Sequence, residues 1–193
     1  MEMSKAGEGG SGANIANYSY ESKKAKACDL LLRVLGLVFS LVAAVLVGID
    51  KQTKLVDLKI SDALTINLPV PAKYHYVSAF VYFVVANAIA CGYAGVSAVV
   101  GGVASRGGRR SRGLEAVMRV MDSVMVGLLF SACGGAIAVG VIGFQGNSHL
   151  QWHKVCNVFS RFCHQVAAAS LLSLLSSLTF LLLLLLPALR AIY

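Results

Sequence analysis

Four long runs of apolar residues dominate the pattern of hydrophobic and polar positions along the chain. A helix that crosses the hydrocarbon core of a bilayer needs about 20 consecutive, mostly apolar residues. Each run reaches about that length, so we predict an all-α membrane protein built as a four-helix transmembrane bundle. The predicted spans cover residues 30–49, 76–100, 117–144 and 166–186, and Pro187 is expected to close the last one.

The stretch between the first two spans has a different pattern. Both "VDLKIS" and "TINLPV" alternate apolar and polar residues, which is typical of β-strands with one covered face. The intervening "SDAL" favours a turn between them. We therefore predict a short β-hairpin in the first extracellular loop, with Pro69 at an edge position because proline cannot donate to a ladder of hydrogen bonds.

Composition supports the membrane interpretation. The chain has 193 residues, of which 57% are hydrophobic and only 13% are charged. A soluble domain cannot cover that much apolar surface, so an integral membrane protein is the class that remains. The net charge of +8 lies mostly in segments that flank the apolar runs. That placement is typical of membrane orientation rather than of nucleic-acid binding.

The distribution of basic residues also predicts the orientation. Four spans place both termini on one side, which carries nine of the Lys and Arg residues outside the spans, against six on the other side. Because cytoplasmic loops are enriched in Lys and Arg, both termini are predicted to be cytoplasmic. The expected organisation is a disordered cytoplasmic tail over residues 1–29, a transmembrane domain over 30–189 and a short cytoplasmic end over 190–193.

Two ionisable residues interrupt the apolar runs. Arg33 lies three residues past the start of the first span, and Asp122 lies well inside the third. A charged side chain within a bilayer costs at least about 2.5–3.5 kcal/mol. Both residues are expected at a similar shallow depth, where they can form a bidentate pair that clamps two helices, and Arg119 can share Asp122 or reach toward the interface. A polar path for ions is the alternative interpretation of the pair.

Small residues recur every four positions in the second span. Such rows let helix backbones approach closely in lipid, where packing replaces the hydrophobic driving force. Shorter rows occur in the third and fourth spans, so we predict that the chain self-associates; the alternative is that every row serves only the bundle of one chain. The residues of this helix-packing stripe are Ala86, Ala90, Ala94, Ala98 and Gly102.

The outer loop "QGNSHLQWHKVCNVFSRFCHQ" contains several histidines and two cysteines. A metal site built from His149, His153, Cys156 and Cys163 matches no standard zinc spacing. A continuous helix would separate the two cysteines by about 10 Å along its axis, whereas a disulfide needs Cα atoms within roughly 7 Å. The two structures exclude each other, and the oxidising side of the membrane favours the disulfide between Cys156 and Cys163.

Four stretches of the sequence together resemble one plant family. They are "CDLLLRVLGLV", "DKQTK", "HYVSAFVYFVVANAIACGYA" and "WHKVCNVFSRFCHQVAAA". With Arg in the first span and Asp in the third, the chain resembles the Casparian strip membrane domain proteins and the wider CASP-like family, especially subfamily 1, which is related to the MARVEL tetraspans. The resemblance implies that Arg33 and Asp122 are the paired intramembrane charges and that Cys156 and Cys163 are the outer-loop cysteines.

The resemblance also implies a function. Family members look like multi-pass plasma-membrane scaffolds that form homodimers and heterodimers with related members, and some recruit cell-wall-modifying enzymes. The Casparian strip members share an aromatic-rich segment in the first outer loop, where this chain has only Tyr74 and Tyr76. We therefore predict a CASP-like scaffold role outside the strip itself.

The sequence contains no pattern that indicates an enzyme. It has no nucleotide-binding loop and no convincing arrangement of nucleophile and base. We accordingly predict no catalytic activity, no cofactor, no metal and no nucleic-acid partner; the expected partners are the lipid bilayer, other copies of the chain, related family members and cell-wall enzymes. The alternative function is a channel or transporter subunit that uses Arg33 and Asp122.

Overall fold

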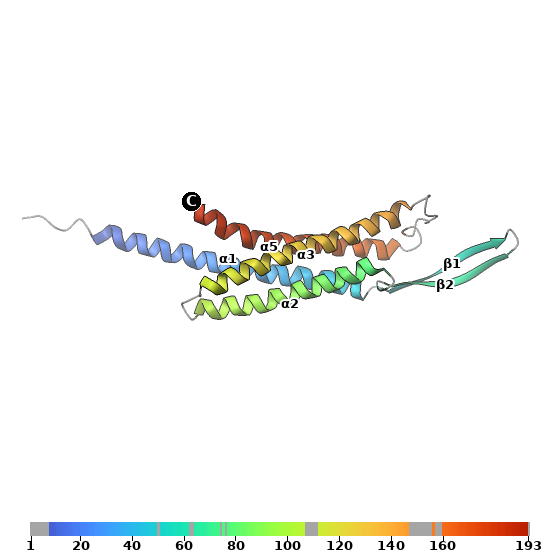
Figure 1. Cartoon of the computed structure of the whole chain (residues 1–193), viewed down its shortest axis with the longest axis horizontal. Helices are drawn as coiled ribbons and strands as arrows, with labels where there is room; N and C mark the ends of the chain where they lie inside the picture. Colours follow the sequence, from blue (N-terminus) through green and yellow to red (C-terminus); the bar gives the residue numbers. More distant parts are fainter. Residues whose placement is uncertain are drawn as a thin grey trace, which may run out of the picture.

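Four long helices run side by side in the computed structural model, with consecutive helices antiparallel (Figure 1). Each contains a stretch long and apolar enough to cross a membrane. The prediction of a four-helix membrane bundle is therefore confirmed. The helices are α1 (Glu8–Gly48), α2 (Ser78–Arg106), α3 (Arg112–Gln145) and α5 (Ser160–Ile192). The structure describes residues 8–49, 51–61, 64–73, 75, 77–106, 112–146, 156 and 160–192.

The N-terminal part of α1 differs from the prediction. The helix begins at Glu8, so the described part of the tail is helical, whereas the sequence predicts disorder over residues 1–29. Once the apolar span has formed a helix, each added residue gains a hydrogen bond without a new nucleation cost. No proline lies between Glu8 and the span to stop this extension.

The last helix is also longer than predicted, at both ends. It begins at Ser160, six residues before the predicted span, and it continues through Pro187 to Ile192. The prediction that Pro187 closes the helix is wrong. A proline removes one backbone hydrogen bond, but membrane helices tolerate it where neighbouring groups and local adjustments satisfy the freed carbonyl.

The predicted hairpin is present and is longer than the alternating segments indicated. Strands β1 (Lys51–Ser61) and β2 (Leu64–Lys73) are antiparallel. Pairing runs from Lys51 opposite Lys73 to Ser61 opposite Leu64, with an irregularity just before the turn. In a two-stranded sheet each strand is an edge, so Pro69 is accommodated opposite Leu55. The hairpin projects from one end of the bundle, here called the hairpin end (Figure 1). The opposite end, where α1 extends beyond the other helices, is called the tail end.

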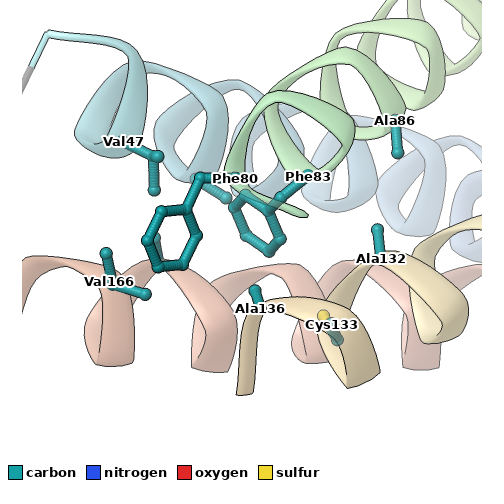
Figure 2. Packing of buried hydrophobic residues seen from close by; sticks show 10 residues of the cluster. Val47, Phe80, Phe83, Ala86, Ala132, Cys133, Ala136 and Val166 are labelled. Atoms are coloured by element: carbon teal, nitrogen blue, oxygen red, sulfur yellow. The ribbon is translucent and has the colours of Figure 1, made fainter. Parts of the chain in front are cut away.

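Two clusters of buried apolar side chains form the core. At the hairpin end, Phe80 and Phe83 of α2 pack among small residues of α3 and against Val47 and Val166 (Figure 2). Toward the tail end, Leu129 and Phe180 belong to a second cluster. The outward faces of all four helices are also apolar, as expected for side chains that contact lipid.

The helix-packing stripe of α2 lies mainly inside the bundle. Ala86, Ala90 and Ala94 are completely buried, whereas Ala98 and Gly102 are half-buried. On the same helix, a Cβ placed at Gly95 would lie 3.4 Å from Leu37 of α1. The stripe therefore lets α2 approach its neighbours within one chain, which leaves most of it unavailable to a second chain.

Candidate functional site: a buried charge network at the tail end

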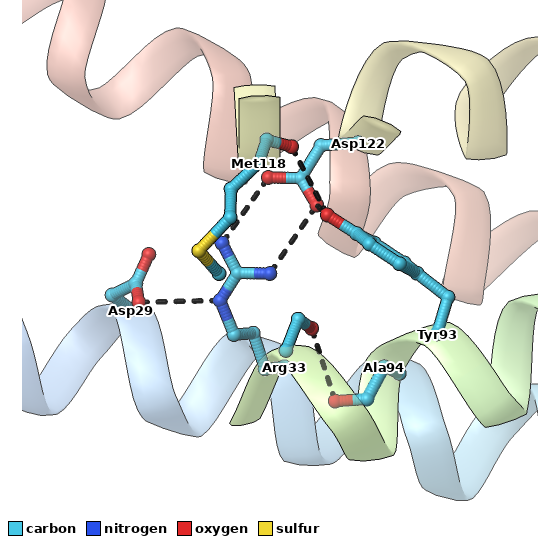
Figure 3. A network of polar contacts seen from close by, with 7 residues as sticks. Asp29, Arg33, Tyr93, Ala94, Met118 and Asp122 are labelled. Atoms are coloured by element: carbon cyan, nitrogen blue, oxygen red, sulfur yellow. Dashed lines mark hydrogen bonds and ion pairs between the residues drawn. The ribbon is translucent and has the colours of Figure 1, made fainter. Parts of the chain in front are cut away.

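The two charges that interrupt the apolar runs are brought together by the fold. Arg33 of α1 and Asp122 of α3 are only 2% and 1% exposed. Nη1 of Arg33 donates to Oδ1 of Asp122, and Nη2 donates to Oδ2, each at 3.2 Å (Figure 3). This bidentate geometry matches the planar guanidinium to the carboxylate and satisfies both groups at once.

A second carboxylate contacts the same guanidinium. Nε of Arg33 donates to Oδ2 of Asp29 at 3.2 Å, one helical turn earlier on α1. Asp29 remains 31% exposed, so it lies at the border of the buried network. Asp29 was not predicted to belong to the site, although its spacing of four residues from Arg33 is the spacing of side chains that meet on one helix face.

Tyr93 of α2 completes the network. Its hydroxyl donates to Oδ1 of Asp122 at 2.6 Å and lies 3.0 Å from the carbonyl oxygen of Met118 (Figure 3). A hydrogen bond to an ionised carboxylate is shorter and stronger than one between neutral groups. The Tyr93 ring also lies 6.0 Å from that of Phe180 on α5. All four helices thus contribute a residue to, or next to, the network.

Arg119 takes no part in the network. It is exposed, and among the described residues it forms no ion pair. Of the two roles predicted for it, sharing of Asp122 is therefore wrong, and reaching toward the interface stays a prediction. The physical reason is competition, because both oxygens of Asp122 already accept hydrogen bonds from Arg33, and Oδ1 also accepts one from Tyr93.

Helices α1 and α5 meet closely at Gly36. The carbonyl oxygen of Gly36 accepts hydrogen bonds from Ser176 of α5 at 3.0 Å and from Ser40 at 2.7 Å. A Cβ at Gly36 would lie only 2.9 Å from Oγ1 of Thr179. A glycine is therefore needed for this close approach. Neither Gly36 nor Ser176 was predicted from the sequence.

Further polar side chains lie deep in the bundle. Asn87, Ser173 and Ser177 are completely buried. Nδ2 of Asn87 donates to the carbonyl oxygen of Phe83 at 2.9 Å. Within the described part of the chain, Oδ1 of Asn87 and the hydroxyls of Ser173 and Ser177 have no hydrogen-bond partner. The interior is therefore more polar than the sequence pattern predicts.

At the hairpin end, a disulfide joins Cys156 to Cys163, with 5.7 Å between their Cα atoms. The predicted bond is confirmed, and it excludes a continuous helix through both residues. Because each sulfur is bonded to the other, neither is available as a metal ligand. His149 and His153 lie outside the described residues, and no group of His, Cys, Asp and Glu suited to a metal occurs among the described ones.

The disulfide is part of a packed corner of the bundle. Cys156 is 8% exposed, and a Cβ at Gly143 of α3 would lie 3.8 Å from its sulfur. Phe162, next to Cys163 at the start of α5, meets Phe80 of α2 edge-on with 5.6 Å between ring centroids. The bond therefore ties Cys156, which lies against Gly143 of α3, to the start of α5.

Several known proteins are similar to this chain in sequence. The chain is 53% identical over 154 residues to CASP-like protein 1E1 of Populus trichocarpa, covering 79% of this chain and 77% of the relative. It is 53% identical over 151 residues to CASP-like protein 1E2 of Vitis vinifera, covering 78% and 76%. It is 46% identical over 150 residues to CASP-like protein 1E1 of Arabidopsis thaliana, covering 77% and 78%.

No solved structure matches the chain. The Casparian strip membrane protein domain matches residues 22–179, a range that holds the whole charge network and both bonded cysteines. The chain is therefore a multi-pass membrane protein that belongs to the Casparian strip membrane protein family.

Proposed function

We propose that the chain is a plasma-membrane scaffold that self-associates, organises membrane domains and recruits cell-wall-modifying proteins. Membership of the Casparian strip membrane protein family supports this role. In the proposal both termini face the cytoplasm, because the basic residues outside the spans concentrate on that side. The proposal assigns no chemical reaction to the chain; its partners are other copies and related family members.

The observation that carries the proposal is the internal satisfaction of the buried charges. Arg33 binds Asp29 and Asp122, and Asp122 also accepts from Tyr93. A group that acts on a substrate or an ion needs unused hydrogen-bonding capacity, whereas Arg33 and Asp122 use theirs to hold helices together. The outer faces of the helices then remain as the surface for partners and lipid.

Self-association needs an exposed face of small residues, and α3 offers one. Gly127, Ser131 and Gly134 are exposed, and a Cβ at either glycine would meet no atom within 4 Å. Backbones approach closely at such positions in lipid. Because the stripe of α2 is buried inside the bundle, we place the contact between copies on α3 instead.

Imaging of a fluorescently tagged chain with photobleaching recovery tests the proposal. The account expects immobile patches in the plasma membrane, and it expects Gly127→Leu with Gly134→Leu to give free diffusion. Gly92→Leu is the matched control, since Gly92 is also exposed but lies on α2, again with no atom within 4 Å of its Cβ position. Free diffusion of the unmodified chain would contradict the scaffold.

Protease added outside intact cells tests the orientation separately. The N-terminal tail and the connection between α2 and α3 are expected to resist digestion, because both lie on the cytoplasmic side in the proposal. Cleavage of the tail in sealed cells would reverse the assigned orientation.

A channel or transporter subunit is the second candidate function. The buried polar atoms of Asn87, Ser173 and Ser177 that lack protein partners favour it, because they extend polarity into the bundle beyond Arg33 and Asp122. The purified chain in planar bilayers would then show an ion conductance that Asn87→Leu abolishes. Immobile patches without any conductance would remove this candidate.

A further inference from the structure

A cavity of about 690 Å³ lies at the tail end, beside the charge network. Sites that bind small molecules typically have volumes of about 300–1,000 Å³. All four helices line the cavity, and Asp29, Arg33, Met118 and Asp122 form part of its wall. Figure 3 shows the side chains of Asp29, Met118 and Asp122 around the guanidinium of Arg33. The cavity therefore has the size and the polar wall of a ligand site.

Three further charged residues line the cavity, and none of them has a partner among the described residues. Lys26 comes from α1, and Glu115 and Arg119 come from α3. Glu115 and Arg119 are four residues apart with the acid first, which is the favourable order for an ion pair on a helix. Yet the structure records no ion pair or hydrogen bond from any of the three to a described residue. The carboxylate of Glu115 and the guanidinium of Arg119 thus both line the cavity, as neighbouring groups of opposite charge.

The charges of the cavity wall balance. Lys26, Arg33 and Arg119 supply three positive charges, and Asp29, Glu115 and Asp122 supply three negative charges. A purely anionic ligand would gain little from such a wall, because the carboxylates would repel it. A ligand that carries one charge of each sign matches it better.

The remaining lining is apolar and points to a lipid. Leu30, Val99, Val103, Leu183 and Leu186 line the same cavity, near the ends of helices that cross the membrane. A soluble zwitterion would leave these side chains uncovered. The glycerol and upper acyl chains of a phospholipid would cover them, so the apolar wall favours a membrane lipid over a free head group.

The chemistry of the wall also selects among zwitterionic lipids. Quaternary ammonium groups are typically held by aromatic cages, and the described residues that line the cavity include no aromatic side chain. A primary ammonium instead donates hydrogen bonds to carboxylates. We infer that the cavity binds the phosphoethanolamine head group of a membrane phospholipid, with its phosphate beside Lys26 and Arg119 and its ammonium beside Glu115 and Asp29.

Competition against spin-labelled phosphatidylethanolamine tests the inference on the full-length chain in detergent. Unlabelled phosphatidylethanolamine should displace the probe at about tenfold lower concentration than phosphatidylcholine or phosphatidylglycerol. Soluble phosphoethanolamine should compete far more weakly, since it lacks the apolar part. Equal competition by the three lipids would overturn the inference. Competition by soluble phosphoethanolamine as strong as that by phosphatidylethanolamine would show that the ligand is a free head group and not a lipid.

Substitutions of cavity residues identify which side chains recognise the lipid head group. Glu115→Gln should remove the preference for phosphatidylethanolamine over phosphatidylcholine, because the ammonium loses an ionised acceptor. Arg119→Gln should weaken both lipids, because both carry a phosphate. Arg112→Gln is the matched control, since Arg112 is exposed on the first turn of α3 but does not line the cavity.

An Arg112→Gln variant with the same loss as Arg119→Gln would show general surface attraction and would contradict the site. Helicity by circular dichroism and a single elution peak establish that each variant is folded. The inference does not depend on the proposed scaffold, because the lipid preference is measured on the purified chain, whether or not that chain forms patches.

Discussion

The two ends of the bundle hold the same helices together by different means. At the tail end, Arg33, Asp122 and Tyr93 join three helices through hydrogen bonds between charged and polar groups. At the hairpin end, apolar packing around Phe80 and the disulfide of Cys156 hold the helices instead. In lipid, apolar packing does not by itself fix which residues of neighbouring helices meet. Each end of the bundle therefore adds a specific link between helices. The polar link depends on both partners being present, whereas the covalent link is sensitive only to reduction.

Removal of one charge at the tail end should have the largest effect. Asp122→Asn leaves the guanidinium of Arg33 without its bidentate partner in a buried site, and breaking a buried pair costs about 3–5 kcal/mol. Arg33→Leu should cost a similar amount, because Asp122 is then left unpaired. Less protein should reach the plasma membrane, which surface biotinylation of tagged variants measures. Asp29→Asn is the milder control, since Asp29 is half-buried and Asp122 still pairs with Arg33.

Opening the disulfide at the hairpin end should have the next largest effect. Cys156→Ser with Cys163→Ser should lower the free energy of unfolding by about 2–4 kcal/mol. Cys91→Ser is the control, because Cys91 is a free cysteine in α2. Thermal unfolding in detergent, followed by circular dichroism, gives the comparison.

Thiol labelling checks the same bond without a mutation. In the proposed orientation, an impermeant reagent applied to the outer face should modify neither Cys156 nor Cys163 until a reductant is added. Labelling of both residues without a reductant would show that no disulfide links the helices at the hairpin end.

A larger side chain at Gly36 should weaken the contact between α1 and α5 by a smaller amount. Gly36→Val places atoms where Oγ1 of Thr179 already lies 2.9 Å from a Cβ position, and overpacking of this kind costs about 1–3 kcal/mol. Gly48→Val on the same helix is the control, because the nearest atom to its Cβ position is 4.0 Å away. Equal melting temperatures for the two variants would show that the close approach is unimportant.

Loss of the Tyr93 hydroxyl should have an effect of about the same size as the Gly36 change, and loss of the Tyr82 hydroxyl should have the smallest effect of all. Tyr93→Phe removes a hydrogen bond to an ionised carboxylate, which is worth about 1.5–3 kcal/mol, but leaves the bidentate pair intact. Tyr82→Phe should change little, because its contact with Ser131 is exposed and 3.4 Å long. A loss of the same size in both variants, measured by thermal unfolding in detergent, would show that Tyr93 contributes only as a ring.

The features that the sequence predicted are those with few alternatives. A charge inside an apolar run is so costly that it needs a partner, and Asp122 was the only candidate for Arg33 well within another run. Two cysteines in an outer loop likewise leave few options. The alternation of "VDLKIS" and "TINLPV" indicated strands, and β1 and β2 contain both segments.

The features that the sequence did not predict depend on helix rotation and contact. Many small residues and several tyrosines occur in the spans, so nothing marked Gly36 as the close contact or Tyr93 as the third member of the network. The rotation of α2, which buries Ala86 rather than exposing it to another chain, is set by packing of the whole bundle. Such choices arise from tertiary contacts that no local pattern encodes.

A double-mutant cycle at the tail end tests the central claim most directly. The variants are Arg33→Leu, Asp122→Leu and the combination of both, and the measured quantity is the amount of chain at the cell surface. The account predicts that each single variant is strongly depleted and that the double variant recovers most of the loss, because no unpaired charge remains in the bundle. A double variant no better than the worse single variant would contradict the claim that the two charges exist to satisfy each other.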